Sequence, residues 1–350
     1  MSSTQTPAAP IRLTQYSHGA GCGCKIAPAV LSEILAKAGA AVPHDKLLVG
    51  NDKRDDAAVF DLDGQTALIS TTDFFMPIVD DPETFGGIAS VNAISDVYAM
   101  GGRPVMAIAI LGWPIDKLPA NVAGDVLAGA REACKRAGIP LAGGHSIDAP
   151  EPIFGLAVTG TAPVNQIKAN ATAEEGCELF LTKPIGIGIL TTAQKKGILQ
   201  EKDLDTVTSL MLRLNNIGAE LSKLDGLKAM TDVTGFGLLG HLVEMCEGSG
   251  LSAEIRFEDV PLIEGIDPYL EAKTFPGGMK RNFASYGHGI GEITELQKAI
   301  LCDPQTSGGL LCAVEPGSRE EFLALCRSHG MELQSFGKMV ARSTHLVEVK

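Results

Sequence analysis

Short β-like runs alternate with helical segments between residues 57 and 163, and this order limits the fold more than any other feature of the chain. The strands are indicated by short apolar runs, and the helices by apolar positions three and four residues apart. The order is strand, strand, helix, strand, helix, strand, over 57–62, 66–73, 87–102, 104–111, 119–137 and 153–163. It predicts an α+β domain that ends near residue 165.

A polar segment at 163–176 interrupts this pattern and predicts a domain boundary. A strand follows at 177–184, and apolar residues at helical spacing predict one helix over 203–224. Because 350 residues exceed what one hydrophobic core usually fills, we expect two domains. The predicted organisation is a flexible N-terminal tail and glycine/cysteine lid over 1–26, an N-terminal α+β domain over 27–165 and a C-terminal α/β domain over 166–350.

Composition excludes several classes of protein. The apolar run at 104–114 spans about 11 residues, whereas a bilayer-spanning helix needs about 20, so we expect no transmembrane segment. The net charge of −13 repels polyphosphate and no basic block offsets it, which argues against a nucleic-acid partner. Eight scattered cysteines, without an export signal at the N-terminus, predict reduced thiols and a cytoplasmic location.

The segment SHGAGCGCKIAP, at 17–28, places two thiols and a cation among three glycines. Pro28 suits the first turn of a helix, so the loop is expected to lead into a helix N-terminus. Cys22 and Cys24, beside Lys25 and this N-terminus, are therefore expected to ionise more readily than an ordinary thiol. Two interpretations of Lys25 stay open: a phosphate-binding cation on a closing loop, or a surface lysine in a mobile tail.

Six polar residues stand at the ends of β-like runs or four residues apart on the apolar helix: Asp55, Asp56, Asp73, Asn92, Asp96 and Asp232. Each alone has an ordinary explanation as a solvated turn, a helix cap or an internal hydrogen bond. Together, these carboxylates suit Mg²⁺, which prefers carboxylate, water and phosphate oxygens. Zinc is disfavoured, because the CGC sequence lacks the usual C-x₂-C spacing and no second ligand pair follows it.

Two segments with adjacent glycines are candidates for anion binding. LAGGHSIDAP at 141–150 and DPQTSGGLL at 303–311 set the glycines beside hydroxyl side chains, where backbone N–H groups can approach an anion closely. Neither has the spacing of a Walker A loop. Each is either a turn or, if the carboxylates lie nearby in space, part of a phosphate cradle.

Seven motifs follow one another in a specific order: GAGCGCK, RDDAAV, TTDFFMPIVDDP, NAISDVYAMGG, AGGHSIDAPEP, TDVTGFGLLGH and DPQTSGGLL. From Ile11 onward the chain resembles the selenophosphate synthetase family. The resemblance implies the fold shared with aminoimidazole ribonucleotide synthetase, with two α+β domains, a homodimer formed through the N-terminal domains and ATP at the cleft associated with the dimer. The implied reaction converts ATP, selenide and water into selenophosphate, AMP and phosphate.

The resemblance also assigns residues. It makes Cys22 the catalytic cysteine and Lys25 the essential lysine that contacts ATP, with Mg²⁺ bound by Asp56, Asp96 and Asp232. The nucleotide-contacting positions that it implies are Lys25, Lys53, Arg54, Asp55, Asp73, Asp96, Gly144, His145 and Ser146. K⁺ is implied as a second cation without assignable ligands, and a selenium-delivery protein is a further expected partner.

Rival interpretations come from two classes. Enzymes that share the fold but use other acceptors, such as thiamine monophosphate kinase, have no need of a CGCK loop. The hydrogenase-maturation carbamoyl dehydratase uses a C-terminal cysteine, whereas this chain ends STHLVEVK. A selenium or soft-metal carrier explains the cysteines but leaves the aspartates and glycine segments unused.

Overall fold

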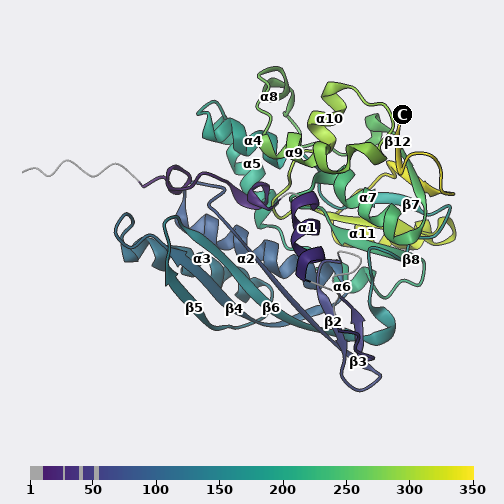
Figure 1. Ribbon diagram of the computed structural model, residues 1–350, viewed down its shortest axis with the longest axis horizontal. Coiled ribbons are helices and arrows are strands. Elements are labelled where there is room, and N and C mark those ends of the chain that lie inside the picture. Colours follow the sequence, from purple (N-terminus) through teal and green to yellow (C-terminus); the bar gives the residue numbers. More distant parts are fainter. Residues whose placement is uncertain (1–10, 27, 39–41, 51–54) are drawn as a thin grey trace, which may run out of the picture.

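The computed structural model describes residues 11–26, 28–38, 42–50 and 55–350. Their strands form two six-stranded sheets, one in each half of the chain (Figure 1). The first sheet consists, from edge to edge, of β1 (Leu47–Val49), β2 (Ala58–Asp61), β3 (Thr66–Phe75), β6 (Ile153–Pro163), β4 (Arg103–Trp113) and β5 (Leu141–Asp148). The second consists of β12 (Val347–Val349), β9 (Ser252–Ile255), β11 (Gly337–Val340), β7 (Glu178–Leu181), β10 (Leu310–Val314) and β8 (Leu227–Asp232).

The N-terminal half contributes three helices, α1 (Pro28–Ala38), α2 (Pro82–Ala99) and α3 (Ala120–Arg136), among the described residues. The described residues of the C-terminal half contain α4 (Ile187–Lys195), α5 (Glu201–Leu212), α6 (Gly218–Leu221), α7 (Gly237–Ser249), α8 (Asp267–Glu271), α9 (Gly277–Tyr286), α10 (Glu295–Leu301) and α11 (Arg319–Ser328). Two 3₁₀ turns, Leu13–Tyr16 and Gly21–Cys24, precede α1. Figure 1 shows α1 lying across the face where the two halves meet.

The central element of the molecule is α2. It contacts β3, β4 and β6 of the first sheet and also β8, α5 and α6 of the second half. All of its residues from Phe85 to Ala99 are buried, which explains why the sequence shows an apolar circumference rather than an amphipathic stripe. The polar side chains of α2 are therefore held between the two halves, where their partners must be protein groups or ligands.

The crossing of α2 with α3 depends on glycine. A β-carbon built on Gly86 would lie 1.8 Å from the carbonyl oxygen of Val126, and one on Gly129 would lie 1.8 Å from that of Glu83. Side chains at either position would force the helices apart. This close crossing fixes the height of α2 above the sheet.

The predicted strands and helices of the first half are present, but two strands were missed. β1 is a three-residue strand, and β5 occupies the segment at 141–150 that was interpreted as a glycine loop or turn. β5 pairs in parallel with β4, and Gly143 and Gly144 have φ values of +131° and +153° where the register between the two strands shifts. Here the glycines serve a close approach of two strands, with a β-carbon on Gly144 falling 2.2 Å from the oxygen of Ala109.

Two expectations for the second half were wrong. Its sheet is antiparallel except for the β9–β12 pair, so this half is α+β rather than an alternating α/β unit. The single helix expected over 203–224 is broken between α5 and α6. The break lets the carbonyl of Arg213 accept from Lys183 Nζ (2.6 Å) and lets Asn215 Nδ2 donate to Ser95 Oγ (2.8 Å). These tertiary bonds outweigh the continuous apolar stripe.

All eight cysteines are free thiols, in agreement with the expectation of reduced thiols. Among the residues that the structure describes, none of the helices combines the length and the apolar character needed to cross a membrane.

Candidate active site

A cavity of about 300 Å³ lies where the two halves meet, and it brings together six of the residues singled out in the sequence. Asp73 stands on β3, Asp96 on α2 and Asp232 at the end of β8, because these three elements pack against one another. The six residues are Lys25, Asp55, Asp56, Asp73, Asp96 and Asp232. Thus carboxylates separated by more than 170 positions in the chain face one cavity.

Cys22 is fully buried beside this cavity. Its backbone N–H donates to Thr306 Oγ1 (3.1 Å) and its thiol donates to Asn92 Oδ1 (3.2 Å). Burial raises the pKa of the Cys22 thiol well above its ordinary value, and the negative charge of Asp73 adds to this effect while Lys25 opposes it. The pKa of Cys24 is also raised, chiefly by burial. The expectation of a readily ionised thiol was therefore wrong for this conformation, because burial outweighs the nearby cation.

Asn92 joins the cysteine loop to the charged cavity. Its Oδ1 also accepts from the backbone N–H of Ser307 (2.7 Å), and its Nδ2 donates to Asp73 Oδ2 (2.7 Å). Asp73 Oδ2 in turn accepts from Lys25 Nζ (3.1 Å). One buried amide thus orients the thiol, the carboxylate and the cation together.

Lys25 is held as a cation in the cavity. Its partial burial lowers the pKa, but the negative charges of Asp73 and Asp96 raise it more, so the pKa lies well above the ordinary value. The ammonium is therefore retained at neutral pH. A fixed positive charge facing a carboxylate-lined space can neutralise a phosphate group.

Three carboxylates of the cavity destabilise one another as anions. Burial, followed by the charge of Asp232, raises the pKa values of Asp56 and Asp96 well above the ordinary range. The pKa of Asp232 is raised to about 6 by burial, against a lowering by its hydrogen bond from Ser95. Such mutual repulsion is relieved either by protons or by a cation.

The donor set fits a hard divalent cation that keeps other ligands. Asp56 Oδ1 accepts from Thr231 (2.9 Å) and Asp96 Oδ2 from Thr71 (2.5 Å), whereas the second oxygens of Asp56 and Asp232 are buried without a hydrogen-bond partner. In the described part of the chain, no three acidic, histidine or cysteine side chains lie close enough together to hold a metal ion by themselves, so a bound ion would need further ligands. An open carboxylate set is what Mg²⁺ uses when water and substrate phosphate complete its shell.

The cavity wall contains residues that the sequence reasoning missed: Thr71, Thr234, Phe236, His241 and Glu244. His241 Nε2 accepts from the N–H of Thr234 (3.0 Å), and burial together with Lys25 lowers its pKa to about 3. The imidazole is therefore neutral, and its Nδ1, 3.4 Å from Glu244, carries the proton. The available signal was the three-residue spacing of His241 and Glu244 on an apolar helix.

Several predicted nucleotide positions lie elsewhere. Gly144, His145 and Ser146 are on the exposed edge strand β5, separated from β3 by β4 and β6. Lys53 and Arg54 lie outside the described residues. The segment at 303–311 is buried, and its backbone N–H groups at 305 and 307 already donate within the protein, so it supports the cysteine loop and leaves no open anion cradle there.

Comparisons with known proteins define the class to which this fold belongs. The family model described as "AIR synthase related protein, N-terminal domain" matches residues 54–162, and that of the C-terminal domain matches 174–350. The structure of thiamine-monophosphate kinase from Stenotrophomonas maltophilia K279a is similar with a TM-score of 0.64 at 19% identity, over 92% of this chain and 96% of that chain. Hydrogenase maturation protein HypE in complex with ATP gives a TM-score of 0.64 at 18% identity, over 97% and 94%. The fold is that of the AIR synthase related proteins.

Closer relatives narrow this class. The chain is 60% identical to "Selenide, water dikinase" of Pseudomonas putida KT2440 over 340 residues, which cover 97% of this chain and 99% of the relative. It is 58% identical to the protein of the same name from Escherichia coli K12 over 330 residues, covering 94% and 95%. The chain therefore belongs to the selenide, water dikinase family.

Proposed function

We propose that this chain catalyses the reaction of ATP, selenide and water to give selenophosphate, AMP and orthophosphate. The observation that carries the proposal is its 58–60% identity, over nearly its full length, to proteins named selenide, water dikinase. The cavity supports it, because a fixed ammonium, a carboxylate cluster and a thiol loop lie together as phosphoryl transfer to a selenium nucleophile requires.

Asp56, Asp96 and Asp232 are the residues that would hold Mg²⁺. The unpartnered oxygens of Asp56 and Asp232 and the raised pKa values of all three carboxyl groups support this assignment. When bound, Mg²⁺ neutralises charge on the ATP phosphates.

Lys25 and Asp73 are assigned to nucleotide binding. Asp73 holds the Lys25 ammonium at 3.1 Å, which aims a positive charge into the cavity without a change of protonation. Asp55 lines the same space, and Lys53 and Arg54 precede it in the chain. The cations Lys25, Lys53 and Arg54 would bind the phosphates and orient ATP for attack at the γ-phosphorus.

Cys22 is assigned to selenium rather than to proton transfer. Selenide is already a strong nucleophile, and the buried thiol keeps its proton on Sγ, so neither needs the other as a base. Cys22 would instead capture or present selenium once its loop exposes the thiol. Enclosure of the nucleotide then serves the second step, in which water cleaves ADP to AMP and orthophosphate.

A homodimer would explain how Gly144, His145 and Ser146 can contact a nucleotide although they lie away from the acidic cavity of their own chain. The first sheet packs α2 and α3 on one face (Figure 1), whereas Phe74, Ile108 and Ile147 on its strands are 48%, 44% and 60% exposed. An apolar sheet surface of this kind favours association with a second copy. We propose that the N-terminal halves pair through it and bring β5 of one copy to the nucleotide of the other.

Three further elements belong to the same proposal and are supported by the resemblance alone: K⁺ as a second cation, a protein that delivers selenium, and a cytoplasmic location.

The nucleotide product tests the proposal. The purified chain is incubated anaerobically with ATP, Mg²⁺ and reductant, with and without selenide, and nucleotides are separated by chromatography. AMP that forms only with selenide is the expected result. ADP as the final nucleotide would identify a simple kinase on this fold, and intact ATP in a selenium-binding sample would identify a carrier.

A further inference from the structure

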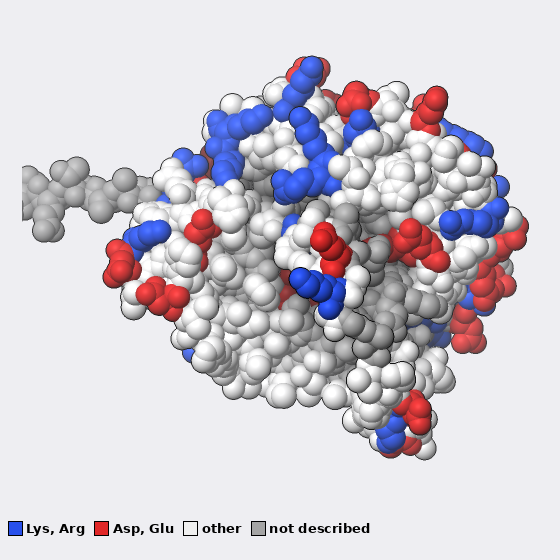
Figure 2. Space-filling model, in the orientation of Figure 1, with Lys and Arg blue, Asp and Glu red and all other residues white. Residues whose placement is uncertain are grey.

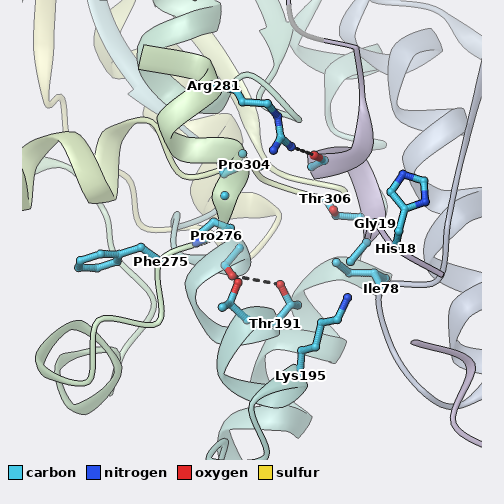
Figure 3. Close-up of a pocket in the computed structure, with 16 residues that line it drawn as sticks. His18, Gly19, Ile78, Thr191, Lys195, Phe275, Pro276, Arg281, Pro304 and Thr306 are labelled. Carbon is cyan, nitrogen blue, oxygen red and sulfur yellow. Dashed lines mark hydrogen bonds between the residues drawn. The ribbon is translucent and has the colours of Figure 1, made fainter. Parts of the chain in front are cut away.

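A second cavity of about 300 Å³ lies against the cysteine loop and shares no lining residue with the acidic cavity. Gly19, Ala20 and Gly23 form one wall, α4 forms another, and the segment that begins α9 forms a third (Figure 3). The space is much larger than a single water molecule requires. It can therefore hold a small ligand beside the backbone of Cys22.

The two charged side chains that line this cavity, Lys195 and Arg281, are both basic. His18, Lys195 and Arg281 are its only titratable side chains among the described residues. His18 pairs with Glu151 (2.9 Å), but neither Lys195 nor Arg281 has an acidic partner in the part of the chain that the structure describes. Figure 2 shows Lys and Arg side chains gathered over the region of α4 and α9. In a chain of net charge −13, this is a local site for an anion.

The donors come from separate elements that converge on one space. Gly188, Thr192 and Lys195 stand at helical spacing on one face of α4, which puts a hydroxyl and an ammonium on the same wall. Gly277 and Gly278 open the ten-residue helix α9, where the first N–H groups have no acceptor within the helix. A guanidinium, an ammonium, a hydroxyl and helix N–H groups are the donors that bind phosphate oxygens.

The cavity is also connected to the catalytic loop by two hydrogen bonds. Arg281 Nη2 donates to the carbonyl of Gly23 (2.8 Å), as drawn in Figure 3. Thr306, which lines the cavity, accepts from the N–H of Cys22 (3.1 Å). An anion that contacts Arg281 therefore acts on the same loop that positions the thiol.

We infer that this cavity is a binding site for a tetrahedral phosphate-class oxyanion, with Lys195 and Arg281 as its principal ligands. The inference depends on the proposed function for the source of the anion, which is selenophosphate or the orthophosphate released with AMP. Occupancy of the site places the product next to the Cys22 loop and outside the nucleotide cavity.

The test measures binding rather than turnover. Orthophosphate is titrated into the full-length protein and followed by ³¹P NMR, with the acidic cavity saturated by Mg²⁺ and a non-hydrolysable ATP analogue. The double variant Lys195→Gln/Arg281→Gln is compared with Lys196→Gln/Lys280→Gln, which removes the same charge from neighbouring residues that do not line the cavity. All four residues are exposed, so both variants are expected to fold.

We expect saturable binding of orthophosphate to the wild type and at least tenfold weaker binding to Lys195→Gln/Arg281→Gln, because each charge-assisted hydrogen bond raises the affinity about tenfold. The affinity of the control variant should stay within about twofold of the wild type. Tighter binding of selenophosphate than of orthophosphate assigns the site to selenophosphate, and the reverse order assigns it to orthophosphate. No saturable binding beside the nucleotide analogue, or equal loss in both variants, overturns the inference. Binding with this pattern in a protein that makes no selenophosphate would keep the anion site and remove the proposed function.

Discussion

Replacement of Asn92 tests whether one buried amide organises the site. Asn92 is fully buried on α2, where it accepts from the Cys22 thiol and the Ser307 N–H and donates to Asp73. The variant Asn92→Ala removes all three bonds and leaves the Ser307 N–H and one lone pair of Asp73 without this partner. Water has no ready access, because Ser307 is also fully buried.

The expected cost follows from these two losses. An unsatisfied buried donor costs about 1–3 kcal/mol, and a lost hydrogen bond to a charged carboxylate costs about 1.5–3 kcal/mol. The free energy of unfolding should therefore fall by about 2.5–6 kcal/mol, a large part of the 5–15 kcal/mol typical of a domain. If about 1.4 kcal/mol of this loss falls on opening of the cysteine loop, alkylation of Cys22 becomes about tenfold faster.

The assay combines urea unfolding with the rate of iodoacetamide labelling, read on the peptide that contains Cys22 by mass spectrometry. Ser90→Ala is the matched control, since Ser90 is equally buried on α2 but donates only to Gly86 of its own helix. The control should lose about 1 kcal/mol and label at the wild-type rate. If Asn92→Ala behaves like this control in both measurements, the amide does not organise the site and the reasoning is refuted.

Three further predictions concern the cysteine loop and the residues that line the acidic cavity. Cys22→Ser and Lys25→Ala should each lower selenide-dependent AMP formation about a hundredfold or more, and normal turnover by either variant would remove its assigned role. The pKa of Asp232 is about 6 in the folded protein and 3.8 in the unfolded chain, so the wild type loses stability as pH rises through that window. Asp232→Asn should therefore raise the free energy of unfolding at pH 7.5 without Mg²⁺ by about 1–3 kcal/mol. The same variant should lose the thermal stabilisation that Mg²⁺ gives the wild type, and stabilisation that persists would contradict the metal assignment. His241→Gln keeps an acceptor for the Thr234 N–H. Because the folded pKa of His241, about 3, lies below the unfolded value of 6.5, wild-type stability should rise between these pH values by up to about 1.4 kcal/mol per unit, and urea unfolding of the variant should show a smaller slope.

The functional aspartates could be predicted because the sequence immediately around each of them indicates that it is unusual. Asp232 ends β8, Asp73 lies two residues before the end of β3, and Asp96 stands on a helix that is buried on every side, so each aspartate needed a partner that its neighbours in sequence did not supply. The packing of α2 between both halves then brings them together. The sequence did not reveal that residues 141–148 form strand β5, because adjacent glycines suit a loop as well as a shift of strand register.

The state of the thiol was not predictable for a different reason. The neighbours of Cys22 in sequence are glycines and a lysine, which favour ionisation, whereas its burial comes from Asn92 and from Thr306, 284 positions away. Burial by distant parts of the chain likewise keeps His241 neutral, and a hydrogen bond from Lys183 to the Arg213 carbonyl accompanies the end of the helix after α5. In each case a tertiary contact outweighs the local sequence pattern, and the sequence around the affected residue does not reveal that contact.

Selenophosphate synthesis by this chain is tested most directly by ³¹P NMR of the full-length protein under anaerobic conditions, with ATP, Mg²⁺ and reductant. In the presence of selenide, we expect AMP, orthophosphate and a selenium-coupled phosphorus signal to appear together, and none of them to appear without selenide. Loss of ATP to AMP or ADP with no selenium-coupled signal would contradict the assignment of the thiol loop and the acidic cavity to selenophosphate synthesis.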